Sequence, residues 1–253
     1  PECSPAGGYL PTRSLPDGSL PELIRNPELS DTFSARLRAA SWQDHQAAES
    51  QRYVSALVAG ELPRQRYADL VAQHHFIYQV LEEAADAMRE DPLAGDFVDD
   101  RLTRLPALEA DLAYLLGPDW AGRVGPNLAT RRYVARMQEV CFTFAPAFIA
   151  HHYTRYLGDL SGGLFIGRQV AQTYGLTEEG GVAFYHFAGI DDPRGYKNAY
   201  RARLDALPLD VTAEAALVGE VAVAYRHNSA VLAELGQEQE PKSVASESME
   251  SAA

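Results

Sequence analysis

Apolar residues recur at helical intervals along most of the chain. The clearest stripe runs through residues 67–85 and ends before Pro92, with Leu70, Ile77 and Leu81 on one helical face. A first helix is expected to begin at the capping residues Ser30 or Asp31 and to lead toward His45, and Gly60 closes a second short helical piece. Further helical patterns cover about 97–116, 128–143, 147–175, 178–188, 192–206 and 212–235.

No stretch alternates apolar and polar residues for long enough to predict a strand, and no repeat of fixed period occurs. The sequence therefore predicts one all-α domain over residues 29–235. Residues 1–28 are punctuated by Pro and Gly without a helical period and are expected to form a poorly ordered leader. Residues 236–253 are polar and acidic, which predicts a disordered tail.

Composition narrows the class of protein further. With 253 residues and 46% hydrophobic content, the chain can bury a sizeable core, and its net charge of -13 argues against nucleic acid as a partner. Cys3 and Cys141 form neither a disulfide framework nor a metal-ligand spacing, so a cytoplasmic location is expected. The longest apolar run, 140–150, is broken by Pro146 and is too short to span a membrane, so no membrane partner is expected.

Segment 153–163 has the apolar spacing of a helix but contains three glycines, among them Gly158 and Gly162. Each interior glycine costs about 1 kcal/mol relative to alanine, so the helix should bend or loosen there. Arg155 and Asp159 share a helical face with these two glycines, so that face is nearly bare backbone beside two charges. Close helix packing would explain the glycines equally well, but packing has no use for a buried aspartate. A flat ligand lying on this face is therefore favoured.

His45 and Glu49 lie one helical turn apart, an arrangement in which a carboxylate can orient an imidazole that binds a metal. A histidine on an amphipathic helix is more often a solvated or core residue than a ligand, so this pair alone leaves both possibilities open. The other histidines are interpreted as ordinary core or surface residues, including His74 and the doublet His151 and His152 beside the glycines.

Lys197 and Arg201 are also one helical turn apart. Such a pair most often forms a solvated basic face, but in so acidic a chain an anionic ligand such as a propionate or phosphate explains it better than it would elsewhere, so both interpretations stay open. Several common enzyme motifs are missing from the sequence: Glu-x-x-His, Cys-x-x-Cys-His, the P-loop and Gly-x-Gly-x-x-Gly. Most common classes of helical enzyme are therefore disfavoured.

Four segments, in order along residues 31–235, resemble the heme oxygenase family: SWQDHQAAE (41–49), FIYQVLEE (76–83), HHYTRYLGDLSGG (151–163) and FYHFAGIDDPRGYKNAYRARL (184–204). The third is the most specific. The resemblance implies a single-domain helical bundle of the heme oxygenase type, with heme between a proximal helix and a kinked, glycine-rich distal helix. It also implies an enzyme that takes heme b as both cofactor and substrate. With O2 and electrons from an external donor, such an enzyme opens the ring at a meso carbon, α expected, giving biliverdin, Fe2+ and CO.

The resemblance also implies residue roles. His45 matches the proximal iron ligand and Glu49 its hydrogen-bonding neighbour, while Gly158 and Gly162 match the glycines whose backbone touches the heme. Asp159 matches the distal carboxylate that orders water near the iron. The remaining matches are Arg155 and Tyr78 in the distal polar network, Arg38, Tyr153, Lys197 and Arg201 at the heme propionates, and Tyr225 over the heme pocket.

Other expectations concern partners and competing functions. The chain has no flavin or nicotinamide motif, so a ferredoxin or flavoprotein reductase is expected to supply electrons, and a monomer is expected. Trp42 stands where mammalian members have a second propionate-side lysine, which predicts a thinner basic rim. A heme carrier that does not degrade heme would share His45 and the basic pair but would not need Asp159. A helical scaffold without a cofactor would leave the glycines and their charges without purpose.

Overall fold

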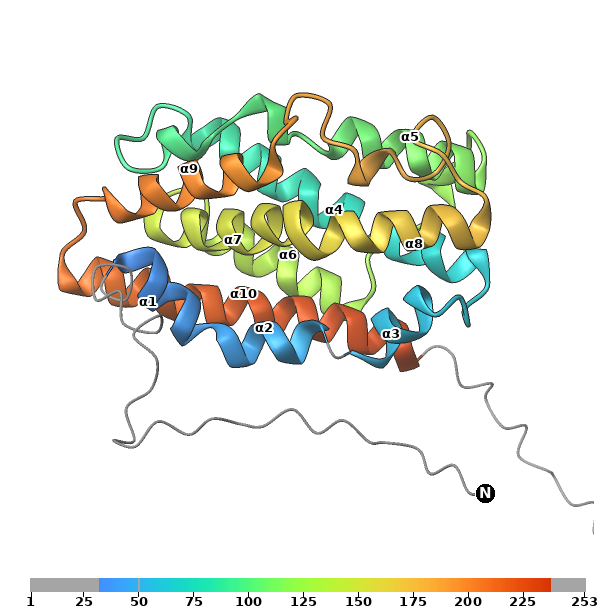
Figure 1. The fold of residues 1–253 in the computed structure, drawn as a ribbon, viewed down its shortest axis with the longest axis horizontal. Helices are drawn as coiled ribbons and strands as arrows, with labels where there is room; N and C mark the ends of the chain where they lie inside the picture. The colour runs from blue at the N-terminus through green and yellow to red at the C-terminus, as the bar shows by residue number, and fades with distance from the viewer. Residues whose placement is uncertain (1–31, 50, 238–253) are drawn as a thin grey trace, which may run out of the picture.

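The computed structural model of the chain describes residues 32–49 and 51–237, and within these ranges it is helical without a named strand (Figure 1). The predicted all-α fold is confirmed. The helices are α1 (Phe33–Ala40), α2 (Trp42–Glu49), α3 (Arg52–Val58), α4 (Arg64–Met88), α5 (Leu105–Leu116), α6 (Leu128–Val140), α7 (Ala145–Gly158), α8 (Leu164–Tyr174), α9 (Pro193–Asp205) and α10 (Val211–Gln237).

The helices form a single bundle around α7 and α8, which run end to end across the centre of Figure 1. Helices α1 to α3 and α10 lie along one side of this pair, and α9 and α5 lie along the other. Helix α10 packs against α2, α3, α6 and α7, so it joins the first helices of the chain to the central ones. None of the helices in the described ranges combines the length and apolar character that a membrane span requires.

The expected first helix is divided in two at Ser41. The Ser41 hydroxyl donates to the carbonyl of Leu37 at 2.9 Å, and the chain turns there before α2 begins. At the start of α1 the cap is Thr32, whose side chain accepts from the backbone N–H of Ala35. Ser30 and Asp31, the predicted capping residues, lie outside the described residues, as do the predicted leader and residues 238–253 of the predicted tail.

Two predicted helical patterns differ from the structure, and at both places a carboxylate from another part of the bundle accepts backbone N–H groups. Residues 97–104 contain the end of the 3-10 turn η2 (Gly95–Phe97) and the 3-10 turn η3 (Asp100–Leu102), and α5 begins where Glu82 accepts the N–H of Leu105 at 3.1 Å. The pattern at 178–188 is wrong as a helix, since only a 3-10 turn, η6 (Ala183–Tyr185), forms there. Asp111 of α5 accepts the N–H groups of Ala183 and Phe184 at 2.8 Å each and so fixes this loop against the bundle.

The glycine-containing segment forms a π-helical turn, η5 (Asp159–Gly163), between α7 and α8. A π turn is a local widening of the helix, and such turns are frequent at functional sites. The predicted pattern at 147–175 thus corresponds to three consecutive elements that together run from Ala145 to Tyr174. Gly175, with φ of 64°, ends α8 in the left-handed conformation that favours glycine.

Candidate functional site

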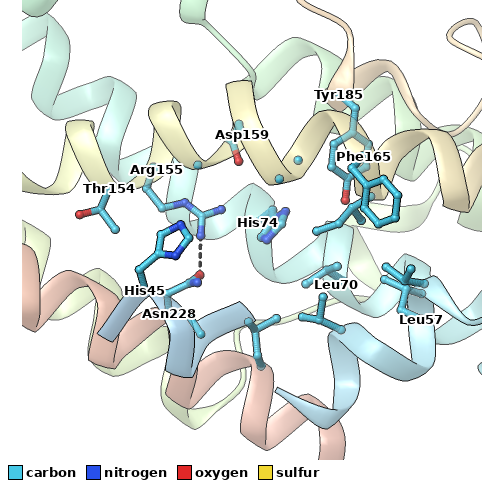
Figure 2. A pocket seen from close by; sticks show the side chains of 18 of the residues that line it. His45, Leu57, Leu70, His74, Thr154, Arg155, Asp159, Phe165, Tyr185 and Asn228 are labelled. Carbon is cyan, nitrogen blue, oxygen red and sulfur yellow. Dashed lines mark hydrogen bonds between the residues drawn. The ribbon is translucent and has the colours of Figure 1, made fainter. Parts of the chain in front are cut away.

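A cavity of about 380 Å³ lies between α2 and the α7–η5–α8 run, within the range of roughly 300–1,000 Å³ that is usual for small-molecule sites (Figure 2). Its remaining walls come from α3, α4, α10 and η6. The polar and charged side chains in the lining belong to His45, Ser55, His74, Thr154, Arg155, Asp159, Tyr185, Tyr225 and Asn228. Apolar groups and glycine backbone make up the rest of the lining.

One wall presents the imidazole of His45 from α2. Its ring stacks on Trp42, with centroids 5.7 Å apart, and meets Tyr225 of α10 edge-on at the same distance. Figure 2 shows the ring facing the glycine-containing segment across the cavity. Glu49, the predicted neighbour of His45, is the last residue of α2, and its side chain lies outside what the structure describes.

The opposite wall contains Gly158 and Gly162, as expected from their shared helical face. A Cβ placed on Gly158 would meet no other atom within 4 Å, because the space beside it is the cavity itself. Gly167, one turn into α8, is different, since a Cβ there would lie 2.6 Å from the ring of Tyr185. Gly158 therefore leaves room for a ligand, whereas Gly167 leaves room for a neighbouring side chain.

Beside these glycines, Asp159 is buried and accepts a hydrogen bond from the Tyr78 hydroxyl. Arg155 donates to the Asn228 side-chain oxygen at 2.6 Å, and its guanidinium lies 5.0 Å from the centre of the Tyr78 ring. Burial raises the pKa of the Asp159 carboxyl, while Arg155 and the Tyr78 hydroxyl act in the opposite direction. Asp159 is thus a carboxyl group held in place at the cavity wall, and its burial favours the protonated form.

Sequence reasoning missed five polar residues of the lining, namely Ser55, His74, Thr154, Tyr185 and Asn228. His74, interpreted above as an ordinary histidine, lines the cavity from α4, and Asn228 lines it from α10. His74 lies one helical turn before Tyr78, and Asn228 lies one turn after Tyr225, so both share a helical face with a predicted site residue. This shared helical face is the sequence signal that could have identified His74 and Asn228 as lining residues.

The residues expected at the propionates lie outside the lining of this cavity. Arg38 and Arg201 line a neighbouring hollow of about 750 Å³ together with Trp42. Burial raises the pKa of Tyr153, and the charges of Arg201 and Arg38 oppose this rise, which places the phenol near both. The two hollows meet where Trp42, in the wall of one, stacks on His45, in the wall of the other.

Lys197 of α9 is attached to the π turn. Its ammonium group donates to the carbonyl oxygen of Leu160 at 2.8 Å and to the hydroxyl of Ser161 at 2.7 Å. This fourth expected propionate residue therefore contacts the two residues of η5 that directly follow Asp159.

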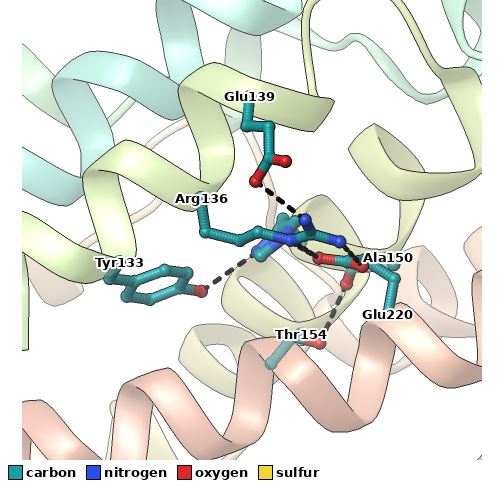
Figure 3. A network of polar contacts seen from close by, with 7 residues as sticks. Tyr133, Arg136, Glu139, Ala150, Thr154 and Glu220 are labelled. Carbon is teal, nitrogen blue, oxygen red and sulfur yellow. Dashed lines mark hydrogen bonds and ion pairs between the residues drawn. The ribbon is translucent and has the colours of Figure 1, made fainter.

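The doublet beside the glycines belongs to the core, as expected. His151 is fully buried and contacts Glu220 of α10 at 3.0 Å, and Glu220 forms an ion pair with Arg136 of α6 at 2.7 Å (Figure 3). His152 is also buried and bonds the Tyr200 hydroxyl at 3.0 Å. Both side chains hold helices together, and neither lines the cavity.

Fold and site together define the class of protein: a helical bundle with a buried ligand site between one imidazole and a glycine-lined π turn. A family model described as heme oxygenase matches residues 31–234, most of the chain, and the chain therefore belongs to the heme oxygenase family.

Individual relatives agree with this assignment. Heme oxygenase 1 from the cyanobacterium Synechocystis is 33% identical over 207 residues, which cover 82% of this chain and 86% of the relative. The crystal structure of heme oxygenase-1 from Synechocystis in complex with heme matches with a TM-score of 0.77 and 32% identity, covering 82% of this chain and 93% of that one. A heme oxygenase structure from Leptospira interrogans matches with a TM-score of 0.76 and 30% identity, covering 80% and 99%.

Proposed function

We propose that the chain is a heme oxygenase that binds heme b and opens the ring at a meso carbon, the α carbon, to give biliverdin, Fe2+ and CO. One observation carries the proposal: a single cavity brings the His45 imidazole opposite both the open backbone of Gly158 and the buried carboxyl of Asp159. Membership of the heme oxygenase family and the heme-bound structure of the Synechocystis relative support it.

The residues present fit a heme. The free space at Gly158 and the imidazole across from it suit a flat ring with a central metal, because a ring can approach backbone more closely than it can approach side chains. His45 is the residue that would bind the iron, oriented by Glu49, and Tyr225 would pack beside it. The heme carboxylates would be held by the basic and phenolic groups of Arg38, Tyr153, Lys197 and Arg201. Of these, Arg38 and Arg201 line the neighbouring hollow.

Bound heme would supply an iron that takes up O2 and the carbon ring that is oxidised. The protein would deliver protons and determine which edge of the ring is oxidised. Asp159 can exchange protons with water in the cavity, since burial raises its pKa, and Tyr78 keeps its carboxyl group in place. Arg155, held by Asn228, balances the charge of Asp159. The backbone of Gly158 and Gly162 would lie close to one part of the ring and direct oxidation to one edge.

Several finer points belong to the same proposal. Electrons and O2 come from outside the chain, with a ferredoxin or a flavoprotein reductase as the donor. The protein acts as a monomer. A reducing cytoplasm suits Cys141, which is a buried free thiol.

The test is a hemin titration of the full chain followed by reduction. We expect a Soret band that saturates at one hemin per chain and, after addition of ascorbate or a reductase system in air, disappears as biliverdin absorption grows. A Soret band that persists under reduction would indicate a heme carrier. No Soret band at all would exclude both heme functions.

A further inference from the structure

Among the polar groups that line the cavity, His74 has no role yet in the proposed function. The residue sits on α4, which crosses behind the site, and it lines the cavity together with His45, Gly158 and Asp159 (Figure 2). Its neighbour one turn earlier on the same helix, Leu70, is apolar and also lines the cavity. His74 is therefore the position at which the α4 wall changes from apolar to polar.

The ring of His74 is held by aromatic contacts. Phe184 lies 5.1 Å away between ring centroids, and Tyr78 meets it edge-on at 6.3 Å. No hydrogen bond joins either imidazole nitrogen to another group within residues 32–49 and 51–237. Aromatic neighbours thus fix the orientation of the ring but leave its nitrogens to the cavity.

The charge state of this imidazole follows from its surroundings. Burial and the positive charge of Arg155 lower the pKa of His74 well below its usual range, so the ring is neutral at physiological pH. A neutral imidazole offers one N–H donor and one lone pair. Polar groups at a cavity wall without a protein partner are normally satisfied by ordered water, which needs polar partners on more than one side. Asp159 lines the same cavity as His74 and provides such a partner, with its carboxyl held by the Tyr78 hydroxyl.

We propose that His74 is a positioning residue that holds a water molecule in the cavity beside Asp159, so that the water reached by the Asp159 carboxyl is fixed from two sides. The inference rests on the proposed function, because the water would lie in the space between Asp159 and the bound ring. His74 would act through this water, with no direct bond to the iron.

The experiment compares variants of the full chain loaded with hemin, reduced and exposed to CO. His74→Leu and His74→Phe remove both nitrogens, the second while keeping a ring between Phe184 and Tyr78. His74→Gln keeps a donor and an acceptor. His75→Leu is the matched control, since His75 also sits in α4 but packs against Trp120 outside the cavity, with ring centroids 4.9 Å apart.

The readout is the C–O stretching frequency in H2O and D2O, which responds to hydrogen bonds from distal water. We expect the Leu and Phe variants to raise the frequency and to lose the solvent-isotope shift, with Gln restoring both and His75→Leu matching the unaltered chain. Biliverdin formation should fall about tenfold in the two apolar variants, because water is still present but no longer fixed.

Three results would overturn the proposal. The first is an unchanged C–O stretch in both apolar variants. The second is a six-coordinate low-spin spectrum of the unaltered protein that becomes high-spin in His74→Leu, since His74 would then bind iron itself. The third is failure of the unaltered chain to bind hemin, which would remove the proposed function as well, whereas the first two leave that function standing.

Discussion

Two residues on opposite walls carry the proposed chemistry, and their surroundings differ. His45 lies in a short helix and is half-buried between Trp42 and Tyr225. Asp159 lies in the π turn, is buried, and is fixed by a phenol hydroxyl. Replacing His45 should therefore change the binding of heme, whereas replacing Asp159 should change what happens to bound heme.

The first prediction concerns the iron ligand. His45→Ala removes the only imidazole that the cavity presents from α2, so we expect a shifted Soret band and hemin affinity weaker by roughly tenfold or more. Imidazole added to the solution should partly restore the band. His186→Ala is the control, because that side chain is exposed and pairs with Glu178 away from the cavity. An unchanged spectrum for His45→Ala would show that another residue binds the iron.

The second prediction separates binding from turnover. Asp159→Ala should bind hemin with nearly unchanged affinity but form biliverdin roughly 10²- to 10⁴-fold more slowly, the usual contribution of a positioned proton donor. Asp159→Asn, which keeps the shape and loses the ionisable carboxyl group, should behave similarly. Hemin titration and single-turnover product analysis measure the two effects independently. Full biliverdin yield from either variant would contradict the role assigned to Asp159.

At the residue scale, the sequence predicted the site where a residue type is unusual in its setting. Asp159 stood out as a carboxylate between glycines on one helical face, and that face does open into the cavity. His74 did not stand out, because a histidine in an amphipathic stripe fits a core position equally well. The His74 ring is held at the cavity by Tyr78 of its own helix and by Phe184, a residue far along the chain that local spacing does not reveal.

At the scale of the element, two glycines in the run α7–η5–α8 have different roles: Gly158 leaves space for a ligand, and Gly167 leaves space for the Tyr185 ring. Gly158→Ala places a methyl group in the cavity without a clash, so we expect stability to be unchanged or raised by up to about 1 kcal/mol. Hemin affinity should fall about tenfold, because the methyl group occupies space that the ring needs. Thermal melting without hemin and a hemin titration measure both.

Gly167→Ala is the matched change in the same run. Its methyl group would meet the ring of Tyr185, so we expect a loss of about 1–3 kcal/mol in the free energy of unfolding. The prediction is that Gly167→Ala lowers the free energy of unfolding, whereas Gly158→Ala leaves it unchanged or raises it. Destabilisation by Gly158→Ala, with hemin binding intact, would mean that this glycine serves packing.

The element scale also shows where helical periodicity is sufficient for prediction and where it fails. Long stripes such as α4, α6 and α10 follow the sequence pattern closely because one apolar face meets the rest of the bundle. Residues 178–188 have a similar pattern but form a loop, since Asp111 supplies hydrogen bonds that a helix would otherwise supply. Such a partner, distant in sequence, cannot be recognised from local spacing.

At the scale of the whole molecule, Arg136, His151 and Glu220 join α6, α7 and α10 (Figure 3). Burial opposes ionisation of Glu220, but hydrogen bonds from His151 and Arg136 outweigh it and lower its pKa from 4.5 to about 2. The folded protein therefore holds the Glu220 proton less firmly than the unfolded chain does. This contribution to stability is complete above pH 4.5 and is lost as the pH falls toward 2.

The corresponding prediction uses Glu220→Gln and urea unfolding at several pH values. The variant should lose on the order of 1–2 kcal/mol at pH 7, allowing for solvent screening, and the difference from the unaltered chain should shrink below pH 4.5. Glu139→Gln is the matched control: Glu139 also pairs with Arg136, at 2.9 Å, but is largely exposed, so its loss should cost little at any pH. A pH-independent difference for Glu220→Gln would exclude ionisation as the cause.

The bond between Lys197 and the π turn has a consequence for ligand affinity. Because its ammonium group already donates to Leu160 and Ser161, an incoming carboxylate gains this cation only by sharing it with, or displacing, those two oxygens. The free energy that the Lys197–carboxylate contact contributes to ligand binding is then reduced by the two hydrogen bonds that are lost. It is smaller than the contribution of a solvated lysine at the same distance. The same exchange would weaken the hydrogen bonds between α9 and η5 when the ligand binds. Ligand binding and the attachment of η5 to α9 are therefore coupled.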